Sequence, residues 1–130
     1  MKKIVLTSLL FAIIIYSCSK KKPIAFLPNF KTVLDTVIVG QTKTGIVTIR
    51  NTGTDTLKIE GVKCSCECIV PEIVNTSSIA PNDSLNLKVT VMAYGDDIGK
   101  WKKVLCTFKT NSDSIFLKHY TFFYTKSNKT

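Results

Sequence analysis

The sequence is a succession of short alternating segments separated by turn-forming residues, and this pattern constrains the fold more than any other feature. Residues 85–91 read Leu-Asn-Leu-Lys-Val-Thr-Val, with apolar and polar side chains alternating throughout, and residues 57–60 alternate in the same way. A period of two is that of a β-strand with one buried and one solvated face. Beyond the N-terminal segment, no long stretch carries an apolar stripe at helical spacing. The chain is therefore predicted to be all-β.

Turn-forming residues divide the rest of the chain into further strands of similar length. With 130 residues, the chain is long enough for one domain with its own core. Further strands are expected at residues 32–39, 44–50, 102–110 and 115–124, and residues 24–27 form either a linker or a first edge strand. About seven short strands at this spacing predict an antiparallel β-sandwich of immunoglobulin (Ig) type over residues 29–126.

The N-terminus has the composition of an export signal. Lys2 and Lys3 precede an apolar run over residues 4–16, which is shorter than the roughly 20 residues needed to span a bilayer. The run ends at Ser17-Cys18, and three lysines follow at residues 20–22. This arrangement is similar to a bacterial lipoprotein signal, in which cleavage leaves the cysteine as a lipidated N-terminus. The alternative is a secretory peptide or membrane anchor with an incidental cysteine.

The lipoprotein interpretation fixes an expected organisation and location. Residues 1–17 form the signal peptide, and residues 18–28 form a lipidated Cys18 with a basic tether. Acyl chains such as palmitate on Cys18 would anchor the domain to a membrane. The expected location is the bacterial cell envelope, in the outer membrane facing the periplasm.

The charge of the chain is consistent with a membrane surface. The chain has 18 basic and 9 acidic side chains, a net charge of +9, and removal of Lys2 and Lys3 leaves about +7. The lysines at residues 20–22 would lie beside the lipid, where each contributes about 1 kcal/mol of attraction to anionic headgroups. These lysines therefore indicate a membrane rather than nucleic acid as the partner of the basic segment.

A dense group of cysteines, Cys64, Cys66 and Cys68, lies between two expected strands. Fully extended, the segment would direct all three thiols to one side. Cysteines two apart would then have Cα atoms about 6.6 Å apart, near the upper limit of about 6.8 Å for a disulfide, so a bridge here needs a local bend. An exported protein can form disulfides, and with Cys106 the four cysteines allow three fully paired connectivities.

The same cysteines admit other interpretations. Converging thiolates could bind zinc or Cu(I), with Cys66 and Cys68 as the first candidates, although a second cysteine pair at zinc-type spacing is lacking. A redox role needs a thiol with a depressed pKa, and the Cys-x-x-Cys spacing of thioredoxin-like enzymes is absent. Incidental cysteines are a further alternative. The compartment favours a structural role, as a disulfide or as packed thiols, and no cofactor is expected beyond the lipid on Cys18.

Several other residues are expected to be structural. Cys106 stands between Val104 and Phe108 on one predicted strand face, as a small buried hydrophobe or as a disulfide partner of the cluster. The single histidine, His119, is expected to be a packed or surface strand residue. Six aromatic residues could form a binding stripe, but their expected role on β-strands is core and cross-strand packing; they are Trp101, Phe116, Tyr120, Phe122, Phe123 and Tyr124.

No catalytic set can be assembled from the sequence. The one histidine has no motif partner for a Ser-His-acid triad, and no phosphate-cradling glycine loop is present. The chain is therefore not expected to be an enzyme.

Short motifs in a fixed order resemble a known family. They are Val47-Thr48-Ile49-Arg50-Asn51-Thr52-Gly53, Leu57-Lys58-Ile59, Cys66-Glu67-Cys68, Ile79-Ala80-Pro81-Asn82-Asp83, Gly99, and Lys109-Thr110-Asn111-Ser112. Over about residues 30–124, this order resembles the bacterial family called domain of unknown function 1573, whose members are Ig-like modules akin to ASH and Hydin domains and are often lipoproteins. The chain departs from the family pattern at Glu67 and Asn82, where glycine is usual, and Cys64 is an extra cysteine.

The resemblance implies the fold and an envelope location, and it implies no established activity. The expected function is that of a membrane-anchored periplasmic lipoprotein with a non-catalytic Ig-like domain, which binds an envelope protein or serves envelope structure. The alternative is a thiol-based metal-binding or redox accessory protein that uses Cys64, Cys66 and Cys68.

Overall fold

The computed structural model describes residues 19–72, 78–113 and 116–129, so the expected signal peptide and Cys18 lie outside the described residues. The described strands, together with one 3-10 turn, are β1 (Ala25–Phe26), β2 (Lys31–Ile38), β3 (Thr42–Asn51), β4 (Leu57–Cys64), β5 (Ile69–Glu72), β6 (Ser78–Ile79), β7 (Ser84–Met92), η1 (Gly95–Asp97), β8 (Trp101–Thr110) and β9 (Phe116–Lys126). Within these ranges, no helix has the length and apolar character needed to cross a membrane.

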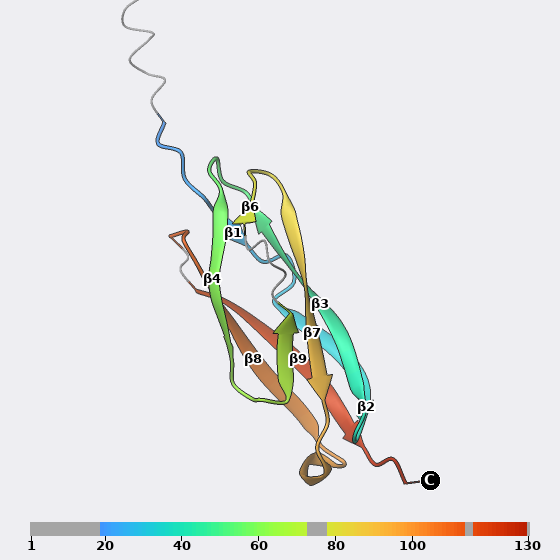
Figure 1. Ribbon diagram of the computed structural model, residues 1–130. Coiled ribbons are helices and arrows are strands. Elements are labelled where there is room, and N and C mark those ends of the chain that lie inside the picture. The colour runs from blue at the N-terminus through green and yellow to red at the C-terminus, as the bar shows by residue number, and fades with distance from the viewer. Residues whose placement is uncertain (1–18, 73–77, 114–115, 130) are drawn as a thin grey trace, which may run out of the picture.

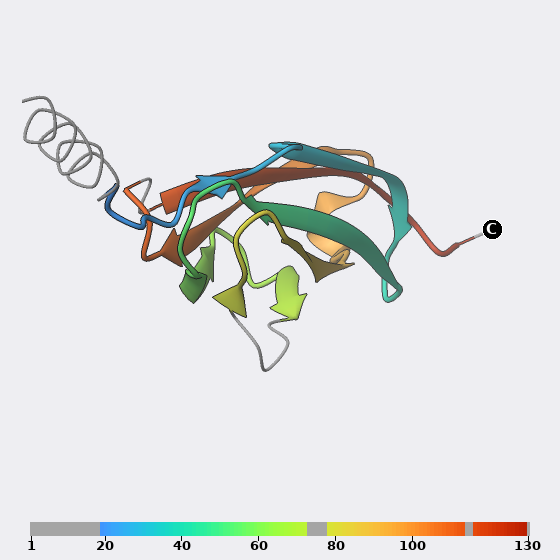
Figure 2. The ribbon, with the colours of Figure 1, turned by 90° about the horizontal axis from the view of Figure 1, so that it is seen from above.

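The strands form two sheets that pack face to face (Figure 2). One sheet has the order β1-β3-β7-β5, and the other has the order β2-β9-β8-β4-β6. The core lies between the sheets, where Ile49 and Val89 of the first sheet and Leu57, Phe108 and Phe123 of the second are fully buried. The predicted all-β, Ig-like sandwich is confirmed.

Two details of the predicted sandwich differ in the structure. Strands β1 and β6, of two residues each, bring the described strands above the seven expected. Strand β2 pairs with β9 in parallel, whereas the other strand pairs are antiparallel. The parallel ladder is interrupted between Val33 and Thr36, where Asp35 adopts φ +56°. A bulge of this kind at an edge strand protects the sheet from pairing with another chain.

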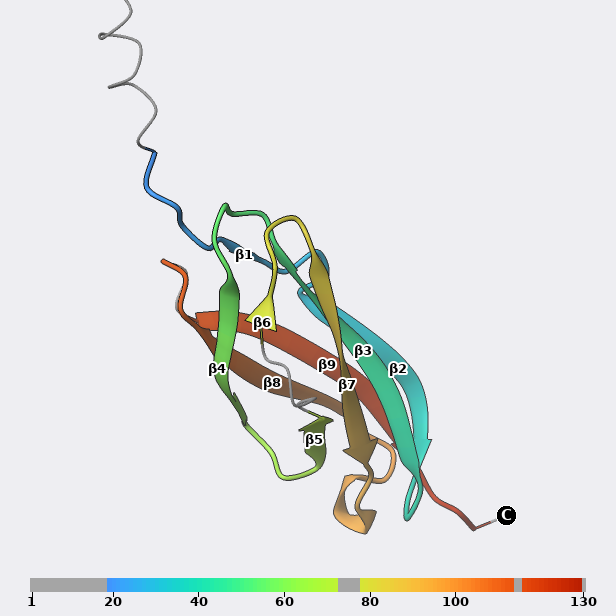
Figure 3. The same ribbon diagram turned by 45° about the horizontal axis from the view of Figure 1, so that its top comes forward.

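The segment that precedes residue 29 is docked onto the sandwich. Residues 25–26 pair with the end of β3, so the edge-strand alternative for residues 24–27 is the observed one (Figure 3). The docking continues back to Lys22, whose carbonyl accepts a hydrogen bond from the Thr54 N–H at 2.8 Å. A Cβ atom on Gly53 would lie 2.2 Å from the Lys22 carbonyl oxygen, so only glycine allows this close approach.

The fully buried side chain of Asn51 connects the docked segment to the core. Its Oδ1 accepts hydrogen bonds from the backbone N–H groups of Ile24 at 3.3 Å and Gly53 at 3.0 Å. Its Nδ2 donates to the carbonyl oxygens of Asp55 at 2.7 Å and Ile79 at 3.0 Å. One amide side chain therefore holds β1, the turn after β3, and β6 together.

The core and cross-strand packing predicted for the aromatic residues near the C-terminus is confirmed only in part, for Phe123 in the core and for the cross-strand pair Trp101 and Tyr124. Phe123 is in the core as expected, but Trp101 and Phe116 are 59% and 60% exposed. Tyr120, Phe122 and Tyr124 are half-buried on the outward face of β9. In β9, the inward positions include His119, Thr121 and Thr125, which are fully or almost fully buried. The period of two was expected, but the polar set faces inward and most of the aromatic set faces out.

Candidate functional site

A β-bulge in β4 determines which way the cysteine cluster faces. Ile59 pairs with Thr110, but Gly61 pairs with Lys109, so β4 advances two residues while β8 advances one. Before the bulge the odd-numbered residues point into the core, as the burial of Ile59 shows. After the bulge the even-numbered residues do so, and Cys64 packs against the core. Without this extra residue, Cys64 would face solvent.

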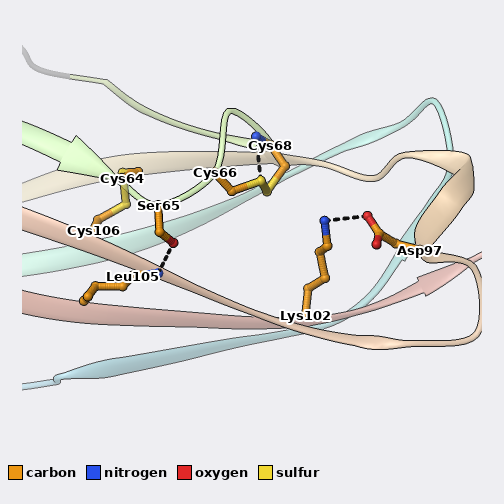
Figure 4. The surroundings of a disulfide bond; sticks show 8 residues. All are labelled: Cys64, Ser65, Cys66, Cys68, Asp97, Lys102, Leu105 and Cys106. Carbon is orange, nitrogen blue, oxygen red and sulfur yellow. Dashed lines mark hydrogen bonds and ion pairs between the residues drawn. A yellow bond between two sulfur atoms is a disulfide. The ribbon is translucent and has the colours of Figure 1, made fainter.

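Cys64 and Cys106 form a disulfide between neighbouring strands of one sheet (Figure 4). They are direct partners in the β4–β8 ladder, and their Cα atoms are 4.0 Å apart. Beside the bridge, the Ser65 N–H donates to the Leu105 carbonyl at 2.8 Å, and the Leu105 N–H donates to the Ser65 hydroxyl at 3.1 Å. Cys106 is buried on the same face as Val104 and Phe108, as predicted, and it is also the bridging partner.

Cys66 and Cys68 form the second disulfide, in the turn that carries the chain from β4 in one sheet to β5 in the other (Figure 4). Their Cα atoms are 5.2 Å apart, closer than the roughly 6.6 Å of an extended strand, so the bend required for a bridge is present. Among the described residues other than glycine, φ is positive only at Asp35 and Asn82. The bend at Glu67 therefore forms without a left-handed backbone conformation. Asn82, the other position where the family pattern has glycine, does adopt a left-handed conformation.

The turn is held on both sides. The Met92 N–H donates to the Cys68 carbonyl at 2.8 Å, which fixes the turn to the end of β7. The Cys68 N–H lies 3.0 Å from Cys66 Sγ. Cys68 is buried, whereas Cys66 is partly exposed and Glu67 is exposed. The disulfide role expected for the cluster is confirmed, and the structure adds the pairing, which braces the crossing between the two sheets.

The disulfides leave no free thiol at Cys64, Cys66, Cys68 or Cys106 in this structure. Within the described ranges, no three His, Cys, Asp or Glu side chains are grouped so that they could hold a metal ion. In the disulfide-bonded state, these four cysteines therefore act as structural cross-links.

His119 is packed in the core, which is one of the two environments expected for it. It is the β9 partner of Cys106 and is fully buried. Its Nε2 lies 3.1 Å from the Thr32 hydroxyl of β2, and its Nδ1 has no hydrogen-bond partner among the described residues. Burial disfavours the charged imidazolium and lowers the pKa of His119 below its ordinary value of 6.5.

A second feature lies on the outward face of β2, β9 and β8, where sequence reasoning favoured core packing over a binding stripe and did not foresee the neighbouring lysines. In the ladder, Trp101 pairs with Tyr124 and their ring centroids are 5.6 Å apart. In the next row, Lys103 pairs with Phe122, which pairs with Val33. We call this surface the aromatic–lysine face and define it by Lys31, Val33, Trp101, Lys103, Tyr120, Phe122 and Tyr124.

The aromatic–lysine face is hollowed where its strands meet. A depression of about 280 Å³ is lined by Lys31, Val33, Trp101 and Phe122. The Nζ of Lys103 lies 4.4 Å from the centroid of the Tyr120 ring and 5.9 Å from that of Phe122. The signal in the sequence that indicates this surface is the set of aromatic residues at alternate positions, Tyr120, Phe122 and Tyr124.

The fold and the cysteine pairing define a small Ig-like β-sandwich braced by two disulfides. The chain belongs to the family described as protein of unknown function, DUF1573, whose model matches residues 29–120. The family suggested by the sequence motifs is thereby confirmed. No curated protein matches the chain.

Solved structures support the fold at low sequence identity. A protein of unknown function from Porphyromonas gingivalis matches with a TM-score of 0.67 and 13% identity, over 84% of this chain and 50% of that one, so this chain spans half its length. The ASH/PapD-like domain of human CEP192 matches with a TM-score of 0.59 and 9% identity, over 88% and 93%. The secreted serine protease VesC from Vibrio cholerae matches with a TM-score of 0.53 and 16% identity, over 82% and only 23%.

Proposed function

We propose that the protein is a lipid-anchored module of the bacterial cell envelope, whose Ig-like domain binds a protein partner or serves envelope structure and catalyses no reaction. The observation that carries this proposal is the bridging of Cys64 with Cys106 and of Cys66 with Cys68. Disulfides persist in oxidising compartments outside the cytosol. The two bridges therefore support an exported domain, in agreement with the signal-like N-terminus.

The anchor is assigned to Cys18, and its test is direct. Wild-type protein is expected in the membrane fraction, with a diacylglycerol and acyl mass on its N-terminal peptide. The Cys18→Ala variant is expected in the soluble periplasmic fraction, since the inserted chains provide the attachment. A matched Cys18-retaining control, Lys20→Ala, should stay in the membrane. Membrane retention of the Cys18→Ala variant without acyl mass would overturn the anchor.

The alternative function, a thiol-based metal or redox accessory protein, has one observation in its favour. The Cys68 N–H lies 3.0 Å from Cys66 Sγ, where it would stabilise a Cys66 thiolate after reduction. Thiol titration and metal analysis of anaerobically purified mature protein separate the two functions. Bound copper or zinc that is lost in a Cys66→Ser, Cys68→Ser variant would defeat the structural role. Absence of metal together with a loss of stability on reduction would defeat the accessory role.

A further inference from the structure

Strand β9 departs in part from the usual arrangement of a half-buried strand, because polar side chains face the core beside Leu117 and Phe123. His119 Nδ1, Thr121 Oγ1 and Thr125 Oγ1 face the core, and none finds a hydrogen-bond partner in the described part of the chain. Burying polar atoms without partners destabilises a fold. The same strand directs Tyr120, Phe122 and Tyr124 outward. Residues that depart from the rule that apolar side chains face the core are concentrated at functional surfaces. The outward aromatic side chains of β9 therefore indicate a functional surface.

The depression on the aromatic–lysine face suits an apolar side chain. Three of its four lining residues are apolar, and two of these, Val33 and Trp101, are 57% and 59% exposed. An exposed tryptophan beside a small apolar hollow is typical of the energetic centre of a protein interface. The fourth lining residue, Lys31, places a positive charge at the rim of the hollow.

The charge of this surface extends over the neighbouring strands. Outward lysines stand at Lys31, Lys63, Lys103, Lys109 and Lys118. Of these, Lys109 is paired with Glu60 at 3.3 Å, and the others have no ion pair among the described residues. Surfaces of this sign attract carboxylates and repel basic partners.

The opposite sheet also exposes apolar side chains, at Ile46 and Val70, and its polar side chains pair with one another. There, Thr48 donates a hydrogen bond to Asn86 at 2.8 Å, and Lys88 lies opposite Glu72 in the ladder. Arg50 is also exposed there and has no ion pair among the described residues, so both sheets carry positive charge, and the outward lysines are more numerous on the sheet of the aromatic–lysine face.

The aromatic rings of the face are in contact with their neighbours. Lys103 lies over Tyr120 and reaches toward Phe122, and Trp101 packs against Tyr124 at an interplanar angle of 56°. The face therefore combines an apolar hollow with positive charge. A protein segment matches this combination, because it offers an apolar side chain and carboxylates together.

The position of the face also disfavours a bilayer. Trp101 begins β8 directly after η1, at the end of the sandwich that lies opposite residue 19 (Figure 1). An anchor at Cys18 would hold the other end of the domain at the membrane.

We propose that the aromatic–lysine face binds an acidic protein segment, which inserts one apolar side chain between Val33, Trp101 and Phe122 and places carboxylates against Lys31 and Lys103. This inference rests on the proposed binding function and names the surface and the chemistry of the partner.

The test is a titration of the mature acylated protein in mild detergent with a fluorescein-labelled synthetic peptide, Asp-Glu-Leu-Phe-Glu-Asp, read by anisotropy. A second peptide replaces the acidic residues with lysine. We expect saturable binding of the acidic peptide alone. Trp101→Ala and the double variant Lys31→Glu, Lys103→Glu should each weaken binding by about tenfold or more. Ile46→Ala and Lys88→Glu, matched changes on the opposite sheet, should leave binding unchanged.

A second readout protects the test against misfolded variants. Trp101 is the only tryptophan, so its emission in the unaltered protein should shift to shorter wavelength when the acidic peptide covers it. An unshifted emission at saturation would overturn the proposal. Unchanged binding of the peptide to both face variants would also overturn the proposal. The same holds if polygalacturonate, an oligonucleotide or anionic phosphatidylglycerol vesicles bind this face as tightly as the peptide does.

Photo-cross-linking in cells separates failure of the face from failure of the binding function. A photoreactive residue at position 101 should give a discrete protein adduct, and one at position 46 should not. An adduct from position 46 alone would overturn the face and leave a binding module in place. Adducts from neither position, with normal membrane fractionation, would overturn both the face and partner binding.

Discussion

The two disulfides should stabilise the domain to very different extents, because they close loops of very different length. Cys64 and Cys106 are separated by 42 residues in the sequence, and Cys66 and Cys68 by 2. In the chain-entropy description, these bridges contribute about 4 and about 1.5 kcal/mol, respectively, to the free energy of unfolding. The Cys64→Ala, Cys106→Ala variant should therefore lose about 2.5 kcal/mol more than the Cys66→Ala, Cys68→Ala variant.

The comparison is well matched. Each pair contains one buried cysteine, Cys106 or Cys68, each 1% exposed, and one partly exposed cysteine, so the cost of the cavity left by truncation largely cancels. Equilibrium unfolding in urea, with dithiothreitol-treated wild type as the doubly reduced reference, gives both free energies. Equal losses, or a larger loss from the Cys66 and Cys68 pair, would refute the reasoning and indicate that the turn between the sheets is the main brace.

Three further predictions concern single residues. Asn51→Ala should lower the free energy of unfolding by about 3 kcal/mol or more, measured in urea, since it leaves buried backbone groups without partners; a loss below about 1 kcal/mol would contradict its central role. Gly53→Ala should displace the segment around Lys22, so amide hydrogen exchange should become faster at residues 24–26 while the rest of the domain stays protected. Unchanged exchange at residues 24–26 would contradict the close approach of Gly53 to the Lys22 carbonyl. Burial lowers the pKa of His119, so below about pH 6.5 the unfolded chain binds more protons than the folded one, and the free energy of unfolding should fall toward acid by up to about 1.4 kcal/mol per pH unit. The His119→Gln variant should show a flatter pH dependence in unfolding curves between about pH 7 and pH 5. An equally steep dependence in this variant would assign the effect to carboxylates.

Period-two alternation made the sandwich predictable wherever a strand follows the common rule. Residues 85–91 illustrate this, because Leu87, Val89 and Val91 are all buried as the pattern predicts. Short-range motifs also placed the cysteine cluster correctly at a corner between strands. The fold class and the family could therefore be read from local information.

The remaining features depend on long-range or irregular structure. The bulge beside Gly61 changes which residues of β4 face inward, and no local pattern announces it. The pairing of Cys64 with Cys106 follows from that bulge and from the β4–β8 register. In β9, apolar and polar residues also alternate, but alternation alone does not say which set faces the core. There, the inward position of His119 and the outward position of Tyr120 follow from the pairing with β8.

The hydrogen bonds between Lys22 and Thr54 determine how far the domain can reach. The Lys22 N–H donates to the Thr54 hydroxyl at 3.1 Å, and its carbonyl accepts from the Thr54 N–H at 2.8 Å. With an anchor at Cys18, the tether from Cys18 to Lys22 would be at most about 14 Å long when fully extended. A tether of this length would keep the domain at the membrane surface with the η1 end directed away from it, so a partner would bind the domain close to the membrane.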